Sequence, residues 1–439
     1  MNFELERIIH ILNPWLTKPN SLREEIIKKL PSNYIKRKII DEQAYKWNDA
    51  SKIHLIIGTR QVGKSTVIWK YLEENKKRVL FLNCEEPLII DWCTSSALFF
   101  DDVKELLKQI DVIFFEEAQN LNNAGLFFKG LIDLKLGIPI LVTGSSSYHL
   151  HSKTRESLAG RATRYTMTQF SLEELTPPPF EPSMASWKKI AKDIIEKQIC
   201  FGSYPAVWFS ENKENELYDL IEAFIIRDAS DLFKIKYVNS FRQLLKLISW
   251  QIGNLVNYSE WSGIIGVDNN TTKHYVEILE ETGIVKIIYP YVGGKRAEIT
   301  SSPNVYFADT GLRNAFERRF LPLDERSDRG PLFENWVVAE LSKILPHDVD
   351  IKFWRTKSGS EADFVLLQGM NLAGMEVKCT ALDRGKISKS SRSFIEAYNP
   401  KYFYIINRGY EGEENISNTK VMYLKPESIL KIKEKFGKV

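Results

Sequence analysis

One short segment, Gly58-Thr59-Arg60-Gln61-Val62-Gly63-Lys64-Ser65, constrains this chain more than any other feature of the sequence. It fits the pattern G-x-x-x-x-G-K-[ST], and it stands between a short apolar run and a segment with helical periodicity. Glycines let the backbone turn with its amides inward, and the start of a helix attracts anions. The segment therefore predicts a loop that cradles the phosphates of a nucleotide, formed by Gly58, Thr59, Arg60, Gln61, Val62, Gly63, Lys64, Ser65 and Thr66.

Two side chains of this loop have predicted roles. The amine of Lys64 is expected to reach the β- and γ-phosphates, and the hydroxyl of Ser65 is expected to ligate Mg²⁺. The cofactors that follow from the motif are ATP and Mg²⁺. Arg60 either steers the nucleotide or is an ordinary exposed arginine of the loop.

The sequence around the loop alternates between strands and helices. Buried strands are expected at 53–57, 79–82, 112–115, 138–143 and 165–167, and helices at 64–74 and 101–109. Strands separated by helices imply crossover connections, so the predicted fold class is α/β with a parallel sheet.

Acidic and polar residues follow two of the predicted strands. Glu116 and Glu117 come after Ile113-Phe114-Phe115, where the first acid is expected to hold the Mg²⁺ shell and the second to orient an attacking water. Ser145 or Ser146 ends the next strand, and either is a sensor of the γ-phosphate if that strand lies between the other two. The alternative is a plain Gly-Ser loop.

A positive charge beside the γ-phosphate would stabilise the transition state of phosphoryl transfer. Arg161 is the leading candidate for this catalytic role, with Arg164 and Arg227 as rivals. A surface salt bridge is the competing interpretation for each of the three.

A proline cluster at 177–182 marks a domain boundary. Residues 185–235 read as helical with a break at 202–205, which suggests a lid. Helices at 241–252, 258–265 and 270–282, followed by strands at 284–291 and 298–306, suggest a winged helix, with Asn269 as the helix cap. In that case Thr271, Thr272, Lys273 and His274 would meet a DNA groove, and Lys295 and Arg296 would contact phosphate.

The last part of the chain, with strands at 351–355, 362–367, 374–378 and 402–406, carries a D…E-x-K pattern. Asp363 is expected to oppose Glu376 and Lys378 across a hairpin that turns at 369–371, and Glu334 of the preceding helix adds a fourth group. Asp363, Glu376 and Glu334 can hold Mg²⁺, and Lys378 can position water or stabilise a phosphate. The alternative is a nuclease-like fold whose ion-paired cluster does not cut.

These motifs together resemble those of the prokaryotic AAA-like ATPases that carry a C-terminal domain of unknown function with a restriction-endonuclease-like fold. The shared segments are GTRQVGKST at 58–66, IFFEEAQ at 113–119, VTGSSS at 142–147, LAGR at 158–161, GSYPAV at 202–207, IIRD at 225–228, FENWVVAEL at 333–341, FWRTKSGSEADFV at 353–365 and MEVK at 375–378. Glu116 departs from this resemblance, because the group usually has Asp there, and Ser203 stands where Gly is commoner.

The resemblance implies five parts. They are an N-terminal lead-in (1–34), an AAA-like P-loop NTPase core with a parallel sheet (35–172), a helical lid (173–236), a winged helix (237–310) and a PD-(D/E)-x-K nuclease-like α/β domain (311–439). The expected function is ATP hydrolysis coupled to nucleic-acid binding or cleavage. The alternative is a slow nucleotide-dependent switch with a docking domain that does not cleave.

Composition adds few restrictions. A net charge of +3 neither demands nor excludes nucleic acid, so a DNA surface would have to be a local patch. The four cysteines are scattered without zinc or redox spacing, and no secretory signal or membrane-spanning stretch is apparent, so we expect a cytoplasmic protein. The expected partners are ATP, DNA through the winged helix and the C-terminal domain, and further copies of the chain.

Overall fold

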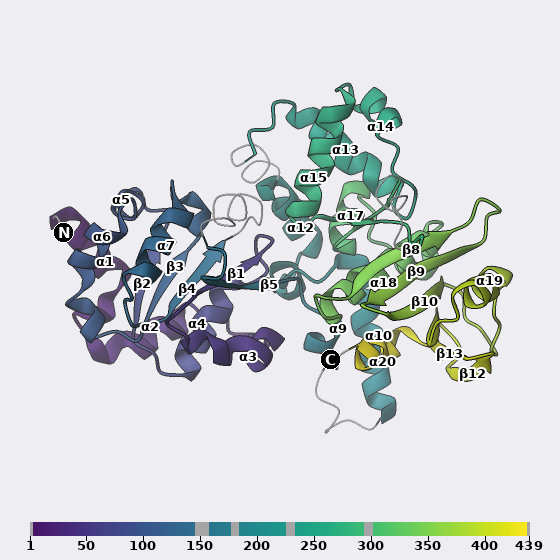
Figure 1. Ribbon diagram of the computed structural model, residues 1–439, viewed down its shortest axis with the longest axis horizontal. Coiled ribbons are helices and arrows are strands. Elements are labelled where there is room, and N and C mark those ends of the chain that lie inside the picture. Colours follow the sequence, from purple (N-terminus) through teal and green to yellow (C-terminus); the bar gives the residue numbers. More distant parts are fainter. Residues whose placement is uncertain (1–2, 145–157, 177–183, 225–232, 294–301, 437–439) are drawn as a thin grey trace. The chain divides into compact units, whose positions relative to one another are not determined.

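The computed structural model describes residues 3–144, 158–176, 184–224, 233–293 and 302–436 (Figure 1). The chain forms two compact units, Met1–Thr168 and Gln169–Val439. Among the described residues, no helix is both long and apolar enough to cross a membrane.

A parallel sheet forms the centre of the first unit. Its strands run in the order β2-β3-β4-β1-β5, and every neighbouring pair is parallel. The predicted strands are confirmed, and β4 does lie between β3 and β1. The strand bounds are β1 (Ile53–Gly58), β2 (Val79–Asn83), β3 (Val112–Glu116), β4 (Ile140–Gly144) and β5 (Ala162–Met167).

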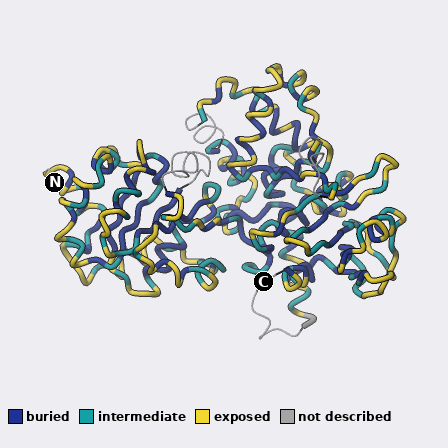
Figure 2. Tube along the Cα trace, in the orientation of Figure 1, coloured by how far each residue is buried: buried dark blue, intermediate teal, exposed yellow. Residues whose placement is uncertain are grey.

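Helices cover the sheet, and β1 to β4 are buried along most of their length, whereas the edge strand β5 is partly exposed (Figure 2). Helix α4 spans Lys64–Glu74 as predicted. The prediction of a helix over 101–109 is wrong: α6 spans Ser96–Val103, because the hydroxyl of Ser95 accepts from the Leu98 amide and starts the helix earlier. The other elements are α5 (Pro87–Trp92), η4 (Leu106–Lys108), η5 (Ala118–Asn120) and α7 (Ala124–Asp133).

The N-terminal segment contacts the edge strand β2. The side-chain amide of Asn13 donates to the Phe81 carbonyl at 2.9 Å and accepts from the Phe81 amide at 2.6 Å, and the Trp15 indole donates to Val79. These bonds satisfy backbone groups of β2 that an edge strand would expose. The segment contains α1 (Phe3–Leu12), η1 (Pro14–Leu16), η2 (Pro19–Ser21), α2 (Leu22–Lys28), α3 (Lys38–Gln43) and η3 (Ala44–Asn48).

The second unit begins with helices. Its described helices between 184 and 223 are interrupted after Phe201 and resume at Pro205, in agreement with the predicted break, and three more helices are followed by an antiparallel strand pair. The N-cap of the third of these helices, α15, is Asp268 rather than the predicted Asn269, because the Asp268 carboxylate accepts from the Asn270 and Thr271 amides. The elements are α9 (Leu172–Leu175), α10 (Met184–Phe201), α11 (Pro205–Phe209), α12 (Lys213–Ala223), α13 (Val238–Trp250), α14 (Tyr258–Ile265), α15 (Asn269–Glu281), β6 (Val285–Ile288), β7 (Asn304–Phe307) and α17 (Thr310–Glu317).

A mixed sheet completes the second unit, in the order β12-β13-β11-β10-β9-β8. The predicted hairpin joins β9 and β10, and Gly369 at its turn has φ +57°. Helix α18 packs on one face of this sheet, and α19 packs on the other. The elements are η7 (Leu323–Glu325), α18 (Arg329–Ile344), β8 (Asp350–Arg355), β9 (Glu361–Gln368), β10 (Asn371–Lys378), α19 (Lys389–Tyr398), β11 (Tyr402–Asn407), β12 (Gly412–Ile416), β13 (Thr419–Leu424), η8 (Pro426–Ser428) and α20 (Leu430–Phe436).

Candidate nucleotide site and carboxylate cluster

The loop between β1 and α4 depends on its two glycines. A Cβ on Gly58 would lie 2.2 Å from the carbonyl oxygen of Met167 on the neighbouring strand, so no larger residue fits without movement. Gly63 has φ +90°, a left-handed conformation that starts α4 without the steric cost of a side chain. Gln61 is also left-handed, with φ +58°, which is uncommon for a residue with a Cβ. The loop is thus held in a conformation that its sequence alone would not prefer throughout.

The side chain of Lys64 folds back over this loop. It is buried, and its amine donates to the carbonyls of Gly58 at 3.2 Å and Thr59 at 2.9 Å. The positive charge of Lys64 therefore lies against the backbone of the loop. A lysine at this position of the motif is expected to contact phosphates.

The hydroxyl of Ser65, at the start of α4, lies close to the carboxylate of Glu116, at the end of β3. Burial raises the pKa of Glu116, while the nearby Ser65 hydroxyl and the charge of Lys29 favour its ionised form. The structure thus brings together the two oxygen groups that the sequence predicts as Mg²⁺ ligands.

Glu117 has an unusual backbone. Its φ of +54° and ψ of +46° are left-handed, a conformation that costs about 1–3 kcal/mol and often marks a functional position. Its amide donates to the hydroxyl of Thr143 on β4 at 3.2 Å, and its carboxylate accepts from the Gln119 side chain at 2.6 Å. Sequence reasoning missed Thr143 and Gln119, although both lie within segments that it had singled out.

Arg37 is a further residue that sequence reasoning missed. Its guanidinium is buried and donates to the carbonyls of Val62 and Thr168, each at 2.6 Å. Arg37 thereby ties the loop between β1 and α4 to the segment that follows β5. No motif identifies it, because the contact joins positions far apart in the sequence.

Ser145 and Arg161 are the two remaining predicted catalytic residues of the first unit. Ser145, like its alternative Ser146, lies outside the described residues. The Ile53 amide, at the start of β1, donates to the backbone oxygen of Arg161, so Arg161 lies at the amino edge of a parallel sheet whose carboxyl edge carries the loop. Its guanidinium pairs with Asp133 at 3.2 Å. The structure therefore does not place Arg161 at the nucleotide site of its own chain.

The residues predicted to contact DNA from the winged helix differ in their surroundings. Thr272 is fully buried and donates to the Asp268 carbonyl, so it does not face a groove, contrary to the prediction. Thr271 bonds the Asp268 carboxylate at 2.5 Å, and His274 lies 3.7 Å from Glu277. Lys273 lies over the Tyr258 ring. Lys295, Arg296 and Arg227 fall outside the residues that the structure describes.

In the second unit, Glu376 and Lys378 share one face of β10 as predicted, with Lys378 Nζ 2.8 Å from Glu376 Oε1. The other carboxylate oxygen of Glu376 accepts from the Ser391 hydroxyl on α19 at 2.5 Å. Asp363 accepts from the Val377 amide at 2.6 Å. The D…E-x-K residues are therefore adjacent, but each already has a protein partner.

Glu334 approaches from α18, which covers the other face of the sheet. It accepts from the Tyr306 hydroxyl at 2.5 Å, and burial raises its pKa to about 7. Burial and the neighbouring charges of Glu334 and Glu376 also raise the pKa of Asp363 well above its ordinary value. Within the described ranges, however, no three His, Cys, Asp or Glu side chains are arranged to hold a metal ion. The predicted set of Glu334, Asp363 and Glu376 is thus close together without forming one ligand sphere, because α18 and α19 approach from opposite faces.

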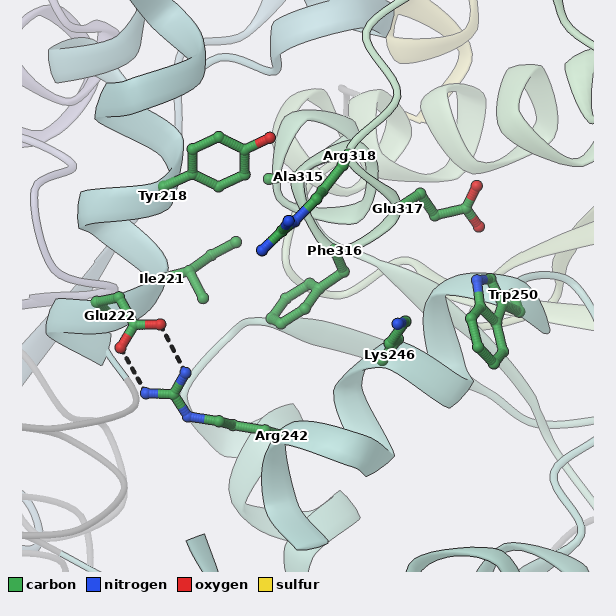
Figure 3. Close-up of a pocket in the computed structure, with 10 residues that line it drawn as sticks. All are labelled: Tyr218, Ile221, Glu222, Arg242, Lys246, Trp250, Ala315, Phe316, Glu317 and Arg318. Carbon is green, nitrogen blue, oxygen red and sulfur yellow. Dashed lines mark hydrogen bonds and ion pairs between the residues drawn. The ribbon is translucent and has the colours of Figure 1, made fainter. Parts of the chain in front are cut away.

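A pocket of about 480 Å³ lies among α12, α13 and α17 in the second unit (Figure 3). Its wall carries aromatic rings and an Arg242–Glu222 pair joined by hydrogen bonds of 2.7 and 2.5 Å. Lys246 lies over the Trp250 ring at 5.2 Å. Nothing in the sequence predicted this pocket, whose residues come from three separate helices.

A comparison with known protein families supports the interpretation of the first unit as an ATPase-type domain. Residues 50–176 match the model of a family described as "AAA domain", which makes this part of the chain an AAA-type P-loop domain. Two further matches are to domains of unknown function, DUF8612 over residues 192–325 and DUF4143 over residues 329–426. Neither of these matches identifies a winged helix or a nuclease-like fold.

The similar curated proteins have no assigned function. An uncharacterised protein of Mycobacterium tuberculosis is 22% identical over 351 residues, which is 78% of this chain and 73% of that protein. An uncharacterised protein of Methanocaldococcus jannaschii is 24% identical over 379 residues, 77% of each chain. Among solved structures, the Thermotoga maritima RuvB Holliday junction branch migration motor is similar at 17% identity with a TM-score of 0.28, over 57% of this chain and 89% of that one.

Proposed function

We propose that the first unit binds ATP with Mg²⁺ and hydrolyses it, and that its nucleotide state controls nucleic-acid binding or cleavage by the second unit. The first half rests on the proximity of the Ser65 hydroxyl to the Glu116 carboxylate, since it brings the end of the phosphate-binding loop beside the acidic end of β3.

The chemistry of Ser65, Glu116 and Lys64 suits the binding of a nucleotide with its Mg²⁺ ion. A hydroxyl and a carboxylate are hard oxygen ligands, and Mg²⁺ in phosphate sites is held by one or two such groups together with the phosphates. Bound there, the ion would neutralise charge on the β- and γ-phosphates. Ser65 and Glu116 would hold it, and Lys64 would exchange its two carbonyl partners for phosphate oxygens.

Glu117 is the proposed catalytic carboxylate. Its left-handed backbone, fixed by the bond from its amide to Thr143, directs the residue away from the line of β3. A carboxylate at this edge can orient a water for attack on the terminal phosphate. Arg161 would contribute only to the site of a neighbouring copy in a homo-oligomer, because it lies at the opposite edge of its own sheet.

The proposed nucleic-acid role of the second unit is supported by the proximity of Asp363, Glu376 and Lys378. A metal ion recruited by a phosphodiester would have to displace the Val377 and Ser391 donors from the two carboxylates. The three-helix and strand-pair arrangement of residues 237–310 is the order expected of a winged helix.

One observation favours the alternative, a slow nucleotide-dependent switch. Gln119 donates to the Glu117 carboxylate at 2.6 Å, so this side chain competes with an attacking water for the proposed catalytic group. Glu116, one methylene longer than the usual Asp, also favours slow turnover.

One assay separates the proposals. Wild type, Lys64→Ala and Asp363→Ala are incubated with DNA, Mg²⁺ and ATP, while phosphate release and DNA cleavage are both followed. ATP-dependent cleavage that Asp363→Ala abolishes supports the coupled enzyme. ATP turnover that ignores DNA, without cleavage, supports the switch, and no turnover or ATP binding by wild type rejects both.

A further inference from the structure

A second crevice in the second unit lies between α10, the start of α18 and the ends of three strands. Its volume is about 700 Å³, which is within the range of cavities that bind small molecules. It is separate from the pocket of Figure 3, which lies among α12, α13 and α17.

The position of the crevice in the sheet is informative. Strands β10, β11 and β13 are adjacent and parallel, and the crevice is lined by the residues that immediately follow them, namely Cys379, Arg408 and Lys425. In open α/β sheets, ligands bind outside the carboxyl ends of the parallel strands. The crevice also begins one residue beyond Lys378 of the D…E-x-K pattern.

The charge of the crevice is strongly positive. Its lining includes Lys188, Lys189, Lys192, Arg329, Arg408 and Lys425 against Glu196, Asp324 and Glu427. Two of the acids are engaged: Asp324 is bonded by both guanidinium nitrogens of Arg408, and Glu196 accepts from the Leu323 amide at 3.1 Å.

Four of the six cations, in contrast, form no close ion pair with a described residue, although Arg408 and, to a smaller extent, the charges of Arg329 and Lys192 lower the pKa of Asp324. Lys188 pairs with Glu411 outside the crevice at 3.1 Å. Over the described part of the chain, Lys189, Lys192, Arg329 and Lys425 form no ion pair within 4.0 Å. Six cations against three acids in the lining of one concavity leave an excess of positive charge, and a bound anion would offset the resulting repulsion.

The pocket of Figure 3 provides a contrast. Its Arg242 is neutralised by Glu222 through two hydrogen bonds, and its Lys246 lies over the Trp250 ring. Much of its positive charge is thus already satisfied, so it has less need of an anion than the crevice has.

We infer that the crevice at the carboxyl ends of β10, β11 and β13 binds the phosphate groups of a ligand. Lysine and arginine side chains supply charge-assisted hydrogen bonds to phosphate oxygens, and the unpaired cations come from three separate segments around one space. The phosphates belong either to a nucleic-acid backbone or to a small phosphorylated ligand. The first source rests on the proposed function of the second unit, whereas phosphate binding itself does not.

The test uses the full chain with Lys64→Ala, so that the loop at 58–65 does not compete for the probes. Pyrophosphate and a short labelled single-stranded DNA are titrated against this protein, against Arg329→Glu/Lys425→Glu, and against Lys192→Glu. Lys401→Glu is the matched control, because it makes the same charge change just before the start of β11, at the other edge of the sheet. Thermal unfolding checks that each variant is folded.

We expect Arg329→Glu/Lys425→Glu to weaken pyrophosphate binding by about tenfold or more, and Lys192→Glu to weaken it less, with Lys401→Glu within about twofold of the parent. DNA that binds, and is displaced by pyrophosphate, identifies a nucleic-acid backbone; pyrophosphate binding alone identifies a small phosphorylated ligand. Absence of binding by both probes, or equal binding by the crevice variants and the control, overturns the inference. Either result leaves ATP binding by wild type as a separate measurement of the first unit.

Discussion

The guanidinium of Arg37 donates one hydrogen bond to the carbonyl of Val62, inside the phosphate-binding loop, and a second to the carbonyl of Thr168, each at 2.6 Å. The planar fork of an arginine suits two acceptors at once, and a lysine amine does not reproduce that geometry. The nucleotide loop is therefore stabilised by a residue outside the loop itself.

Replacing Arg37 by Ala should leave both carbonyls without this donor. We expect the first unit to lose about 3 kcal/mol of unfolding free energy, and the affinity for ATP to fall, because the loop is no longer fixed. Urea unfolding and ATP titration measure the two effects. Arg23→Ala, which removes an exposed arginine, is the control. If Arg37→Ala behaves like this control, Arg37 does not support the loop.

The dependence of Mg²⁺–ATP affinity on pH should follow Glu116. Burial raises the pKa of this carboxyl, and only its ionised form ligates a cation. As the pH falls, affinity should therefore begin to drop at a higher pH than an exposed carboxyl, with a pKa of about 4.3, would give. Titrations of wild type and Glu116→Gln from pH 8 to pH 5 test this. A wild-type profile as flat as that of Glu116→Gln would contradict the role of Glu116.

Gln119 should restrain turnover if its bond to Glu117 holds the carboxylate away from the attacking water. Gln119→Ala is then expected to raise the ATPase rate by several-fold, while Glu117→Gln lowers it by about a hundredfold or more. Phosphate release measures both. A decrease in Gln119→Ala, with ATP affinity unchanged, would instead show that Gln119 positions Glu117 for catalysis.

The stability of the second unit should depend on pH through Glu334. Its pKa of about 7 in the folded state exceeds that of an unfolded glutamate, so the folded state binds the extra proton between these values. The corresponding stabilisation is complete below the unfolded pKa, decreases as the pH rises, and is lost above pH 7. It amounts to about 3 kcal/mol.

Glu334→Gln removes this titration. We expect the variant to gain stability relative to wild type as the pH rises from about 4.5 to 8, with Glu413→Gln on the surface as the control. Thermal unfolding over this range measures the difference. A difference between Glu334→Gln and wild type that does not change with pH would show that Glu334 titrates normally.

Local patterns in the sequence predicted much of the fold. The strands of the first sheet and helix α4 follow from apolar runs and periodicity around one glycine motif. The position of β4 between β3 and β1, which the predicted sensor requires, comes from the structure and not from the sequence. The error at 101–109 arose because Ser95 starts α6 earlier, while a short 3-10 turn replaces its predicted end. Helix capping is also a local property of the sequence, so Ser95 could have been recognised as an N-cap.

Contacts between distant segments could not be predicted in this way. Arg37, and the pairing of Asn13 with the edge of β2, depend on where chain segments meet in space. The same holds for Glu334, whose relation to Glu376 depends on which face of the sheet α18 covers. Arg161 shows the opposite case, because a plausible motif lies at the wrong edge of a correctly predicted sheet.

The proposed ATPase activity depends most directly on nucleotide binding by the loop at 58–65. The decisive measurement is calorimetric titration of ATP with Mg²⁺ into wild type, Lys64→Ala and Lys52→Ala, the last being an exposed lysine just before β1, at the other edge of the sheet. We predict that wild type and Lys52→Ala bind alike, and that Lys64→Ala binds at least about tenfold more weakly. No binding by wild type, or equal binding by Lys64→Ala, would contradict the account.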